Sequence, residues 1–224
     1  MIISELLDLG SKILRNSKIK TDQLDSELIL SNLLKKQREK FIITPEEKVS
    51  NCIVNNFNKL IIRRSTREPL AYILKKKEFW SNNFYVNRST LIPRPETELL
   101  CDIILKKIKY KNSHILDIGT GTGCILLSLL SEIKKAKGIG IDISKKAIEV
   151  AKKNSNNLEL NERAKFFARS LDEIYNHKFD LVVSNPPYVK SSDIKNLSED
   201  VRKFEPKIAL DGGKDGLDVI KKVI

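Results

Sequence analysis

The fold class follows from Ile115-Leu116-Asp117-Ile118-Gly119-Thr120-Gly121-Thr122-Gly123, in which a short apolar run leads directly into a glycine-rich turn. An apolar run followed by closely spaced glycines is typical of a strand that turns sharply into a helix. Glycine permits the tight backbone geometry of such a turn and lets a ligand approach the main chain closely. We therefore expect a strand at 115–118, a ligand-binding turn, and a helix from Gly123 to Lys134.

Strands and helices alternate after this turn. A second strand is expected at 138–141, and Ser144 is placed to cap a helix that continues to Asn154. Further apolar strands follow at 166–168 and 181–183. Alternation at this spacing predicts a parallel sheet with helices on its faces.

Asp142 ends the second predicted strand, where a carboxylate can accept two hydrogen bonds from a ribose diol. Dinucleotide sites usually read GxGxxG, whereas the glycines here follow the GxGxG spacing of the methyltransferase version of this fold. In that version the loop holds the methionine portion of S-adenosylmethionine. An NAD-dependent dehydrogenase and a purely structural turn are the less favoured alternatives.

The fourth predicted strand leads into Asn185-Pro186-Pro187-Tyr188. Two prolines remove two backbone donors and leave carbonyl acceptors, with an amide side chain before them and an aromatic ring after them. Such a loop can receive a planar group that carries an NH2, although a rigid turn is the simpler alternative. In an open sheet the loops at the strand carboxyl ends form the ligand crevice, so this loop and the glycine turn are expected to face each other.

Composition limits the remaining classes of function. The chain has 224 residues, 41% of them apolar, and no apolar run is long enough to span a membrane. Its start lacks the pattern of a signal peptide. The three cysteines, Cys52, Cys101 and Cys124, are far apart, and His114 and His177 are isolated. This pattern argues against a zinc site or a disulfide framework and favours a reducing cytosol. The net charge of +12 permits a nucleic-acid partner, but the lysines are scattered.

The first part of the chain is expected to form a small helical domain. Thr44-Pro45-Glu46-Glu47 has the pattern of a helix start, with Thr44 as the cap and Glu47 completing a capping box. Three apolar stripes have helical spacing: Ile3, Leu6, Leu7, Ile13 and Leu14; Leu24, Leu28, Leu33 and Leu34; and Val49, Ile53, Phe57, Leu60 and Ile61.

The residues after this domain change in character. A short hairpin is expected around Ser81-Asn82-Asn83. The prolines of Leu91-Ile92-Pro93-Arg94-Pro95-Glu96-Thr97-Glu98 fix an extended stretch before a helix marked by Leu99, Leu100, Ile103 and Ile104.

Across nearly its whole length the chain resembles the PrmC/HemK family, the glutamine methyltransferases of class I peptide chain release factors. The resemblance is carried by 67–73, 78–80, 91–98, 117–123, 185–188 and 204–206 followed by Ala209-Leu210. It implies an α/β, Rossmann-like class I S-adenosylmethionine-dependent methyltransferase fold preceded by a small all-helical domain. The expected boundaries are 1–77 for the helical substrate-binding domain, 78–95 for the hairpin and linker, and 96–224 for the methyltransferase domain.

The resemblance also implies an activity and a set of site residues. The activity is methylation of the glutamine amide nitrogen in the Gly-Gly-Gln tripeptide of release factors, with S-adenosylmethionine as cofactor. Asn185, Pro186 and Tyr188 would be catalytic, and with Pro187 they would bind the substrate; no metal is expected. The residues that would bind the cofactor are Gly119, Thr120, Gly121, Thr122, Gly123, Asp142, Leu171 and Asn185.

The chain departs from the family pattern in two places. Ser170 stands where family members often have an acid near the adenine, with Asp172 as a candidate substitute and Leu171 able to cover one adenine face. The chain also ends at Ile224, within an expected helix at 217–223 and after four clear strands, whereas the full fold has seven. We therefore expect an incomplete sheet and a chain that is unstable or inactive alone.

Several expectations about partners follow. Release factors would be the protein substrate, held with the help of the N-terminal helices, and the chain would be a cytoplasmic monomer with no membrane association. Arg94 and Glu96 can form an ion pair that orders the inter-domain connection. The open alternatives are a methyltransferase for the exocyclic amine of adenine in nucleic acid, because such enzymes share Asn-Pro-Pro-Tyr, and an inactive binding remnant.

Overall fold

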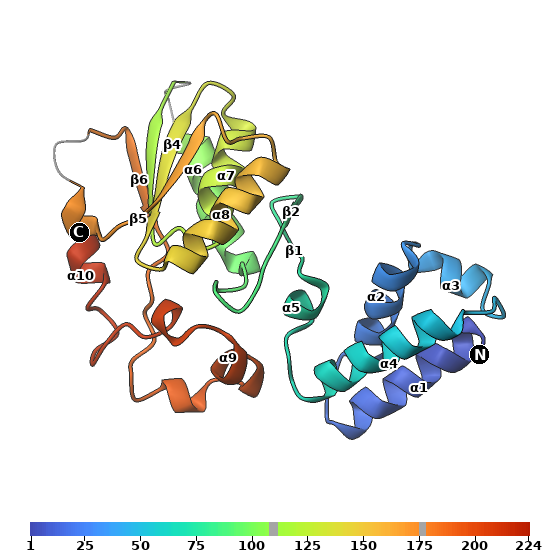
Figure 1. The fold of residues 1–224 in the computed structure, drawn as a ribbon. Helices are drawn as coiled ribbons and strands as arrows, with labels where there is room; N and C mark the ends of the chain where they lie inside the picture. The colour runs from blue at the N-terminus through green and yellow to red at the C-terminus, as the bar shows by residue number, and fades with distance from the viewer. Residues whose placement is uncertain (108–111, 175–177) are drawn as a thin grey trace. The chain divides into compact units, whose positions relative to one another are not determined.

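The computed structural model describes residues 1–107, 112–174 and 178–224 (Figure 1). The chain forms two compact units, Met1–Leu74 and Lys75–Ile224. Within the described residues, no helix is both long enough and apolar enough to cross a membrane. His177 lies outside the described residues.

The first unit is helical, as predicted. Its core includes Ile3, Leu6 and Leu14 from the first predicted stripe, packed with Phe57 and Ile61 from the third. The helices are α1 (Ile3–Asn16), α2 (Asp22–Leu34), α3 (Glu39–Ile43), α4 (Asn51–Ser65) and α5 (Leu70–Leu74).

The buried face of α2 differs from the predicted one. Leu24 of the expected stripe is 40% exposed, whereas Asp25 is buried together with Ile29. The reason is an ion pair: Arg64 Nε on α4 lies 2.7 Å from Asp25 Oδ2, and both side chains are buried. A carboxylate removed from water needs a charged partner, and this pairing turns the helix so that Asp25 faces α4.

The predicted helix start at Thr44 is wrong. Thr44 follows α3 as its C-terminal cap residue, and α4 begins at Asn51 with Ser50 as its cap, the Ser50 hydroxyl accepting from Ile53 N. The carbonyl groups of Pro45 and Glu47 instead accept hydrogen bonds of 3.0 Å from the first amides of α1. Helix-start amides lack partners within their own helix, so α1 takes its acceptors from a segment that cannot then be helical.

The second unit opens with a hairpin of β1 (Lys77–Phe79) and β2 (Asn82–Phe84). Its turn consists of Trp80 and Ser81, both with left-handed backbone angles, so the predicted turn at 81–83 is shifted by one residue. The shift places Phe79 and Phe84 in an edge-to-face contact with ring centroids 6.1 Å apart, and both rings are fully buried.

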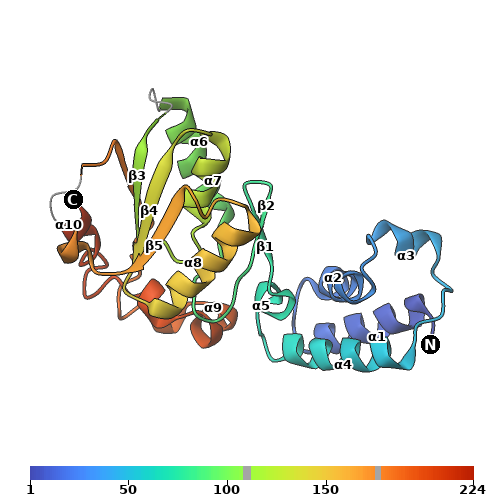
Figure 2. The same cartoon turned by 45° about the horizontal axis from the view of Figure 1, so that its top comes forward.

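The predicted parallel sheet is confirmed. Among the described residues it has four strands in the order β5-β4-β3-β6, all parallel: β3 (His114–Ile118), β4 (Lys137–Asp142), β5 (Ala164–Ala168) and β6 (Leu181–Ser184). One face is covered by α6 (Glu98–Lys107), α7 (Cys124–Glu132) and α8 (Lys145–Asn157), as both ribbon views show (Figures 1 and 2).

The opposite face of the sheet packs against later segments of the chain. Leu116, Ile118 and Ile141 form a second apolar cluster with residues that include Leu171 and Val223. Val223 belongs to α10 (Ile220–Val223), which is shorter than the helix predicted at 217–223. The remaining short elements are η1 (Pro95–Thr97), η2 (Leu171–Glu173), η3 (Ile194–Asn196), α9 (Glu199–Phe204) and η4 (Lys207–Ala209).

A buried amide joins three parts of this unit. Asn154 on α8 accepts from Tyr85 N at 2.7 Å and donates to Tyr85 O at 3.0 Å and to Thr122 O at 2.9 Å. The side chain is fully buried, so all of these bonds form away from water. Asn154 therefore ties the strand end at Tyr85 to the glycine turn.

Replacing Asn154 by Asp should destabilise the second unit by roughly 3 kcal/mol, because a carboxylate lacks the two N–H donors and would face two carbonyl oxygens. Chemical denaturation measures the loss. Asn157→Asp, at an exposed position of the same helix, is the matched control and should change stability by less than about 0.5 kcal/mol. Equal unfolding midpoints for the two variants would contradict this account of Asn154.

Candidate active site

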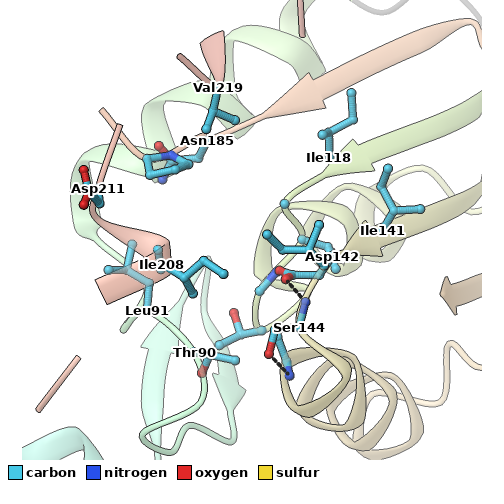
Figure 3. A pocket seen from close by; sticks show the side chains of 18 of the residues that line it. Thr90, Leu91, Ile118, Ile141, Asp142, Ser144, Asn185, Ile208, Asp211 and Val219 are labelled. Atoms are coloured by element: carbon cyan, nitrogen blue, oxygen red, sulfur yellow. Dashed lines mark hydrogen bonds between the residues drawn. The ribbon is translucent and has the colours of Figure 1, made fainter. Parts of the chain in front are cut away.

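A cavity of about 700 Å³ opens at the carboxyl ends of the parallel strands. Register brings the strand ends together, because Ile118 of β3 pairs with Ile141 of β4 and with Ser184 of β6. The residues that follow these three are Gly119, Asp142 and Asn185, and all three line the cavity. Figure 3 shows Asp142 and Asn185 across the cavity from each other. The other walls come from segments 89–97, 169–171 and 207–223.

The glycine turn presents its backbone to this cavity. Gly119 to Thr122 line it, and Gly119 has a left-handed φ of +70° with no atom within 4 Å of the place where a Cβ would stand. A ligand can therefore approach the main chain at Gly119 without meeting a side chain. Gly123 does not line the cavity; it precedes α7 as the cap residue and packs near Leu127.

Asp142 links the two loops that face it. Its Oδ2 accepts from Gly121 N at 3.0 Å, and its Oδ1 accepts from Ser144 N at 2.9 Å. Burial raises the pKa of this carboxyl, and the two backbone N–H groups oppose that shift. A carboxylate has about four acceptor positions, so two remain for the hydroxyl groups of a diol.

The loop after β6 contributes only part of its tetrapeptide to the cavity. Asn185 and Pro187 line it, whereas Pro186 and Tyr188 do not, and Tyr188 is 65% exposed. Asn185 Nδ2 donates to Thr97 Oγ1 at 3.4 Å. The roles predicted for Pro186 and Tyr188 remain predictions.

Ser170 and Leu171 also line the cavity, at the end of the loop after β5. Asp172, the substitute acid considered from the sequence, does not; its Oδ2 accepts from the Ser170 hydroxyl at 3.2 Å. Ser170 caps η2, and this fixes Leu171 at the cavity wall.

The expected ion pair between Arg94 and Glu96 is wrong. Arg94 Nη2 lies 2.7 Å from Glu205 Oε1, and Glu205 Oε2 accepts from Ile92 N at 3.2 Å. Glu96 is exposed, whereas the Glu205 side chain is buried. Burial raises the pKa of Glu205 and the Arg94 charge opposes this rise. A buried carboxylate gains more from a cation than an exposed one does, so Arg94 pairs with the distant partner.

The glycine-rich loop at residues 211–216 supports the Asn185 loop, and reasoning from the sequence missed it. Val189 N donates to Leu210 O at 3.0 Å, and Gly212 N donates to Val189 O at 2.8 Å. A Cβ on Gly212 would stand 2.8 Å from Pro187 O, and one on Gly216 would stand 2.6 Å from Tyr188 O. The cluster of glycines at 212, 213 and 216 was the available signal.

Asp117, treated in the sequence only as part of the glycine motif, is a buried titratable group. Thr120 Oγ1 donates to Asp117 Oδ2 at 2.6 Å, while Oδ1 is buried with no hydrogen-bond partner among the described residues. Burial raises the pKa of this carboxyl to about 7. Asp117 therefore supports the glycine turn through the hydrogen bond that it accepts from the Thr120 hydroxyl.

Comparison with known proteins identifies the family. Residues 5–74 match the PrmC N-terminal domain, and residues 95–203 match the methyltransferase small domain. The release factor glutamine methyltransferase of Caulobacter vibrioides is 39% identical over 91% of this chain and 71% of its own length. This chain belongs to the release factor glutamine methyltransferase family. The sequence-based recognition of the PrmC/HemK family and of its methyltransferase fold is thereby confirmed.

A second relative gives the same result. The release factor glutamine methyltransferase of Buchnera aphidicola subsp. Schizaphis graminum is 40% identical over 96% of this chain and 78% of its own length. Among solved structures, an RNA methyltransferase from Salinibacter ruber in complex with S-adenosyl-L-homocysteine superposes with a TM-score of 0.38 and 21% identity, over 51% of this chain and 72% of that one.

Gly212→Ala should slow methyl transfer at least about tenfold, because its methyl group displaces the Pro187 carbonyl and with it the Asn185 loop. The cofactor dissociation constant should change little, since the glycine turn and Asp142 lie on other strands. Single-turnover rates and cofactor titration measure the two quantities. Lys214→Ala, at an exposed position in the same loop, is the control, and a Gly212→Ala chain with the control's rate would contradict the supporting role of this loop.

Asp117→Asn should change how stability depends on pH. Between pH 3.8 and about 7 the folded chain holds a proton on Asp117 that the unfolded chain has lost, so raising the pH through this window destabilises the fold. Asparagine removes this dependence. The stability of the variant relative to the parent chain should therefore rise by roughly 3 kcal/mol from pH 5 to pH 8. Denaturant unfolding at both pH values measures it, and a constant difference would show that Asp117 is ionised in the fold.

Proposed function

We propose that this chain transfers a methyl group from S-adenosylmethionine to the side-chain amide nitrogen of the glutamine in the Gly-Gly-Gln tripeptide of class I peptide chain release factors. The observation that carries the proposal is one cavity that is lined by Gly119, Asp142 and Asn185 together. A cofactor loop and an acceptor loop thus share a single space, in a chain of the release factor glutamine methyltransferase family.

The residues of the cavity fit the cofactor. The open backbone at Gly119 suits the methionine portion, and the free acceptor positions of Asp142 suit the ribose hydroxyl groups. Leu171 offers an apolar surface for the adenine. When bound, S-adenosylmethionine supplies a methyl group on a positively charged sulfur, which is open to attack by a nucleophile.

The task of the protein is to direct a poor nucleophile. An amide nitrogen is weakly nucleophilic because its lone pair is delocalised into the carbonyl group. Asn185 Oδ1 and the Pro186 carbonyl would each accept one N–H of the glutamine amide, which aims the nitrogen and favours the positive charge that develops on it. Positioning and electrostatics then supply most of the acceleration. Tyr188 would pack against the planar amide group of the glutamine.

The helical unit gives the protein substrate a second surface. Its residues 5–74 match the PrmC N-terminal domain. We propose that this unit helps to hold the release factor, and that the chain acts as a monomer in the cytoplasm, where translation factors work. Direct nucleic-acid binding forms no part of this proposal.

Asn185→Ala should abolish methyl transfer while cofactor affinity falls only modestly, because the acceptor contact is lost and the glycine turn and Asp142 are kept. The assay uses methyl-labelled cofactor and an intact release factor, followed by single-turnover kinetics and cofactor titration. Near-normal turnover of the Asn185→Ala chain would refute the role of this residue.

The choice of acceptor is tested in the same assay with three substrates. Label should appear on the intact release factor and be absent from a version whose Gly-Gly-Gln glutamine is changed to alanine. DNA is the third substrate, and label on it would support an adenine methyltransferase instead. Absence of label on every substrate would contradict activity in this chain and agree with the alternative of an inactive binding remnant.

A further inference from the structure

The side chain of Asn185 contacts Thr97, another residue that lines the cavity. Asn185 Nδ2 lies 3.4 Å from Thr97 Oγ1, and both residues are half-buried and line the cavity. Thr97 ends η1, in the segment between the hairpin and α6. The reaction proposed above makes no use of this contact.

The contact matters because the asparagine side chain has two chemically opposite ends. Its carbonyl oxygen accepts hydrogen bonds and its NH2 group donates them, and a half-turn about the last side-chain bond exchanges their places. Only the orientation in which Oδ1 faces the glutamine amide allows Asn185 to accept an N–H from that amide. In this orientation the Nδ2 group needs a hydrogen-bond acceptor of its own. In the other orientation two donors would face each other.

We propose that Thr97 is a positioning residue: its hydroxyl oxygen accepts a hydrogen bond from Asn185 Nδ2 and holds the side chain where Oδ1 is free to receive an N–H of the glutamine amide. This inference rests on the proposed function of Asn185. It assigns to Thr97 an effect on the rate of transfer that acts through Asn185, with no contact to the reacting atoms.

Thr97 can perform this task because its own place is fixed on both sides. Thr97 N donates to Arg94 O at 3.0 Å, and the Arg94 side chain pairs with the buried Glu205. On the other side Glu98 Oε1 accepts from Trp80 N at 3.0 Å. A hydroxyl held in this way restricts the position of the side chain that it bonds, whereas a hydroxyl on a free loop would move with that side chain.

The test compares Thr97→Val, which removes the acceptor while nearly keeping the shape, with Thr97→Ser, which keeps the hydroxyl. In the full chain with an intact release factor, Thr97→Val should lower kcat about tenfold, the effect of one hydrogen bond, with the cofactor dissociation constant within about twofold. Thr97→Ser should restore most of the rate. Ser198→Ala, which removes an exposed hydroxyl just before α9, is the control and should leave both quantities unchanged.

A second measurement does not depend on activity. The side-chain NH2 resonances of Asn185 in a nitrogen-15 spectrum are identified by their absence in Asn185→Ala. They should shift in Thr97→Val and remain in place in Ser198→Ala.

Four results would overturn the inference: a parental kcat in Thr97→Val, a serine variant as slow as the valine variant, a loss of cofactor affinity equal to the loss of rate, or unmoved Asn185 resonances. A parental chain that labels no release factor refutes the proposed function instead. In that case the resonance shift alone decides whether Thr97 orients Asn185.

Discussion

The position of β3 between β4 and β6 is the constraint on which the site depends. Parallel strands end at a common edge, and here the register pairs Ile118 with Ile141 on one side and with Ser184 on the other. The next residue of each strand, Gly119, Asp142 and Asn185, therefore stands at the same level of that edge. Three positions that are distant in the chain meet because backbone hydrogen bonds fix the register, and a slip of one residue would turn each side chain to the opposite face.

The strand ends form a first wall of the cavity, and segments 89–97 and 207–223 form a second wall. The second wall is held in place by buried polar groups rather than by a sheet. Asn154 holds the main chain at Tyr85, and Glu205 holds Ile92 and Arg94. Such groups are expensive to bury unless they are fully bonded, so each of them admits few alternative arrangements. The segment between the hairpin and α6 has little regular structure, and these bonds give it a defined position beside the strand ends.

Local patterns in the sequence predicted the first wall well. The strands, the glycine turn and the cap at Ser144 all follow from residues close together in the chain, and the structure has them at the predicted places. The errors arose where a distant partner decides the outcome. The buried face of α2 depends on Arg64, and the partner of Arg94 is Glu205. Apolar periodicity and neighbouring charges contain no information about such partners, since long-range pairing is settled only by the packed fold.

The two walls also differ in how far the match to the methyltransferase small domain covers them. The match to the methyltransferase small domain covers residues 95–203, which include all the strand ends. Tyr85, Ile92 and Arg94 precede that match, while Glu205 and the supporting glycines of 211–216 follow it. The second wall is thus built largely from segments that lie outside the match to the methyltransferase small domain.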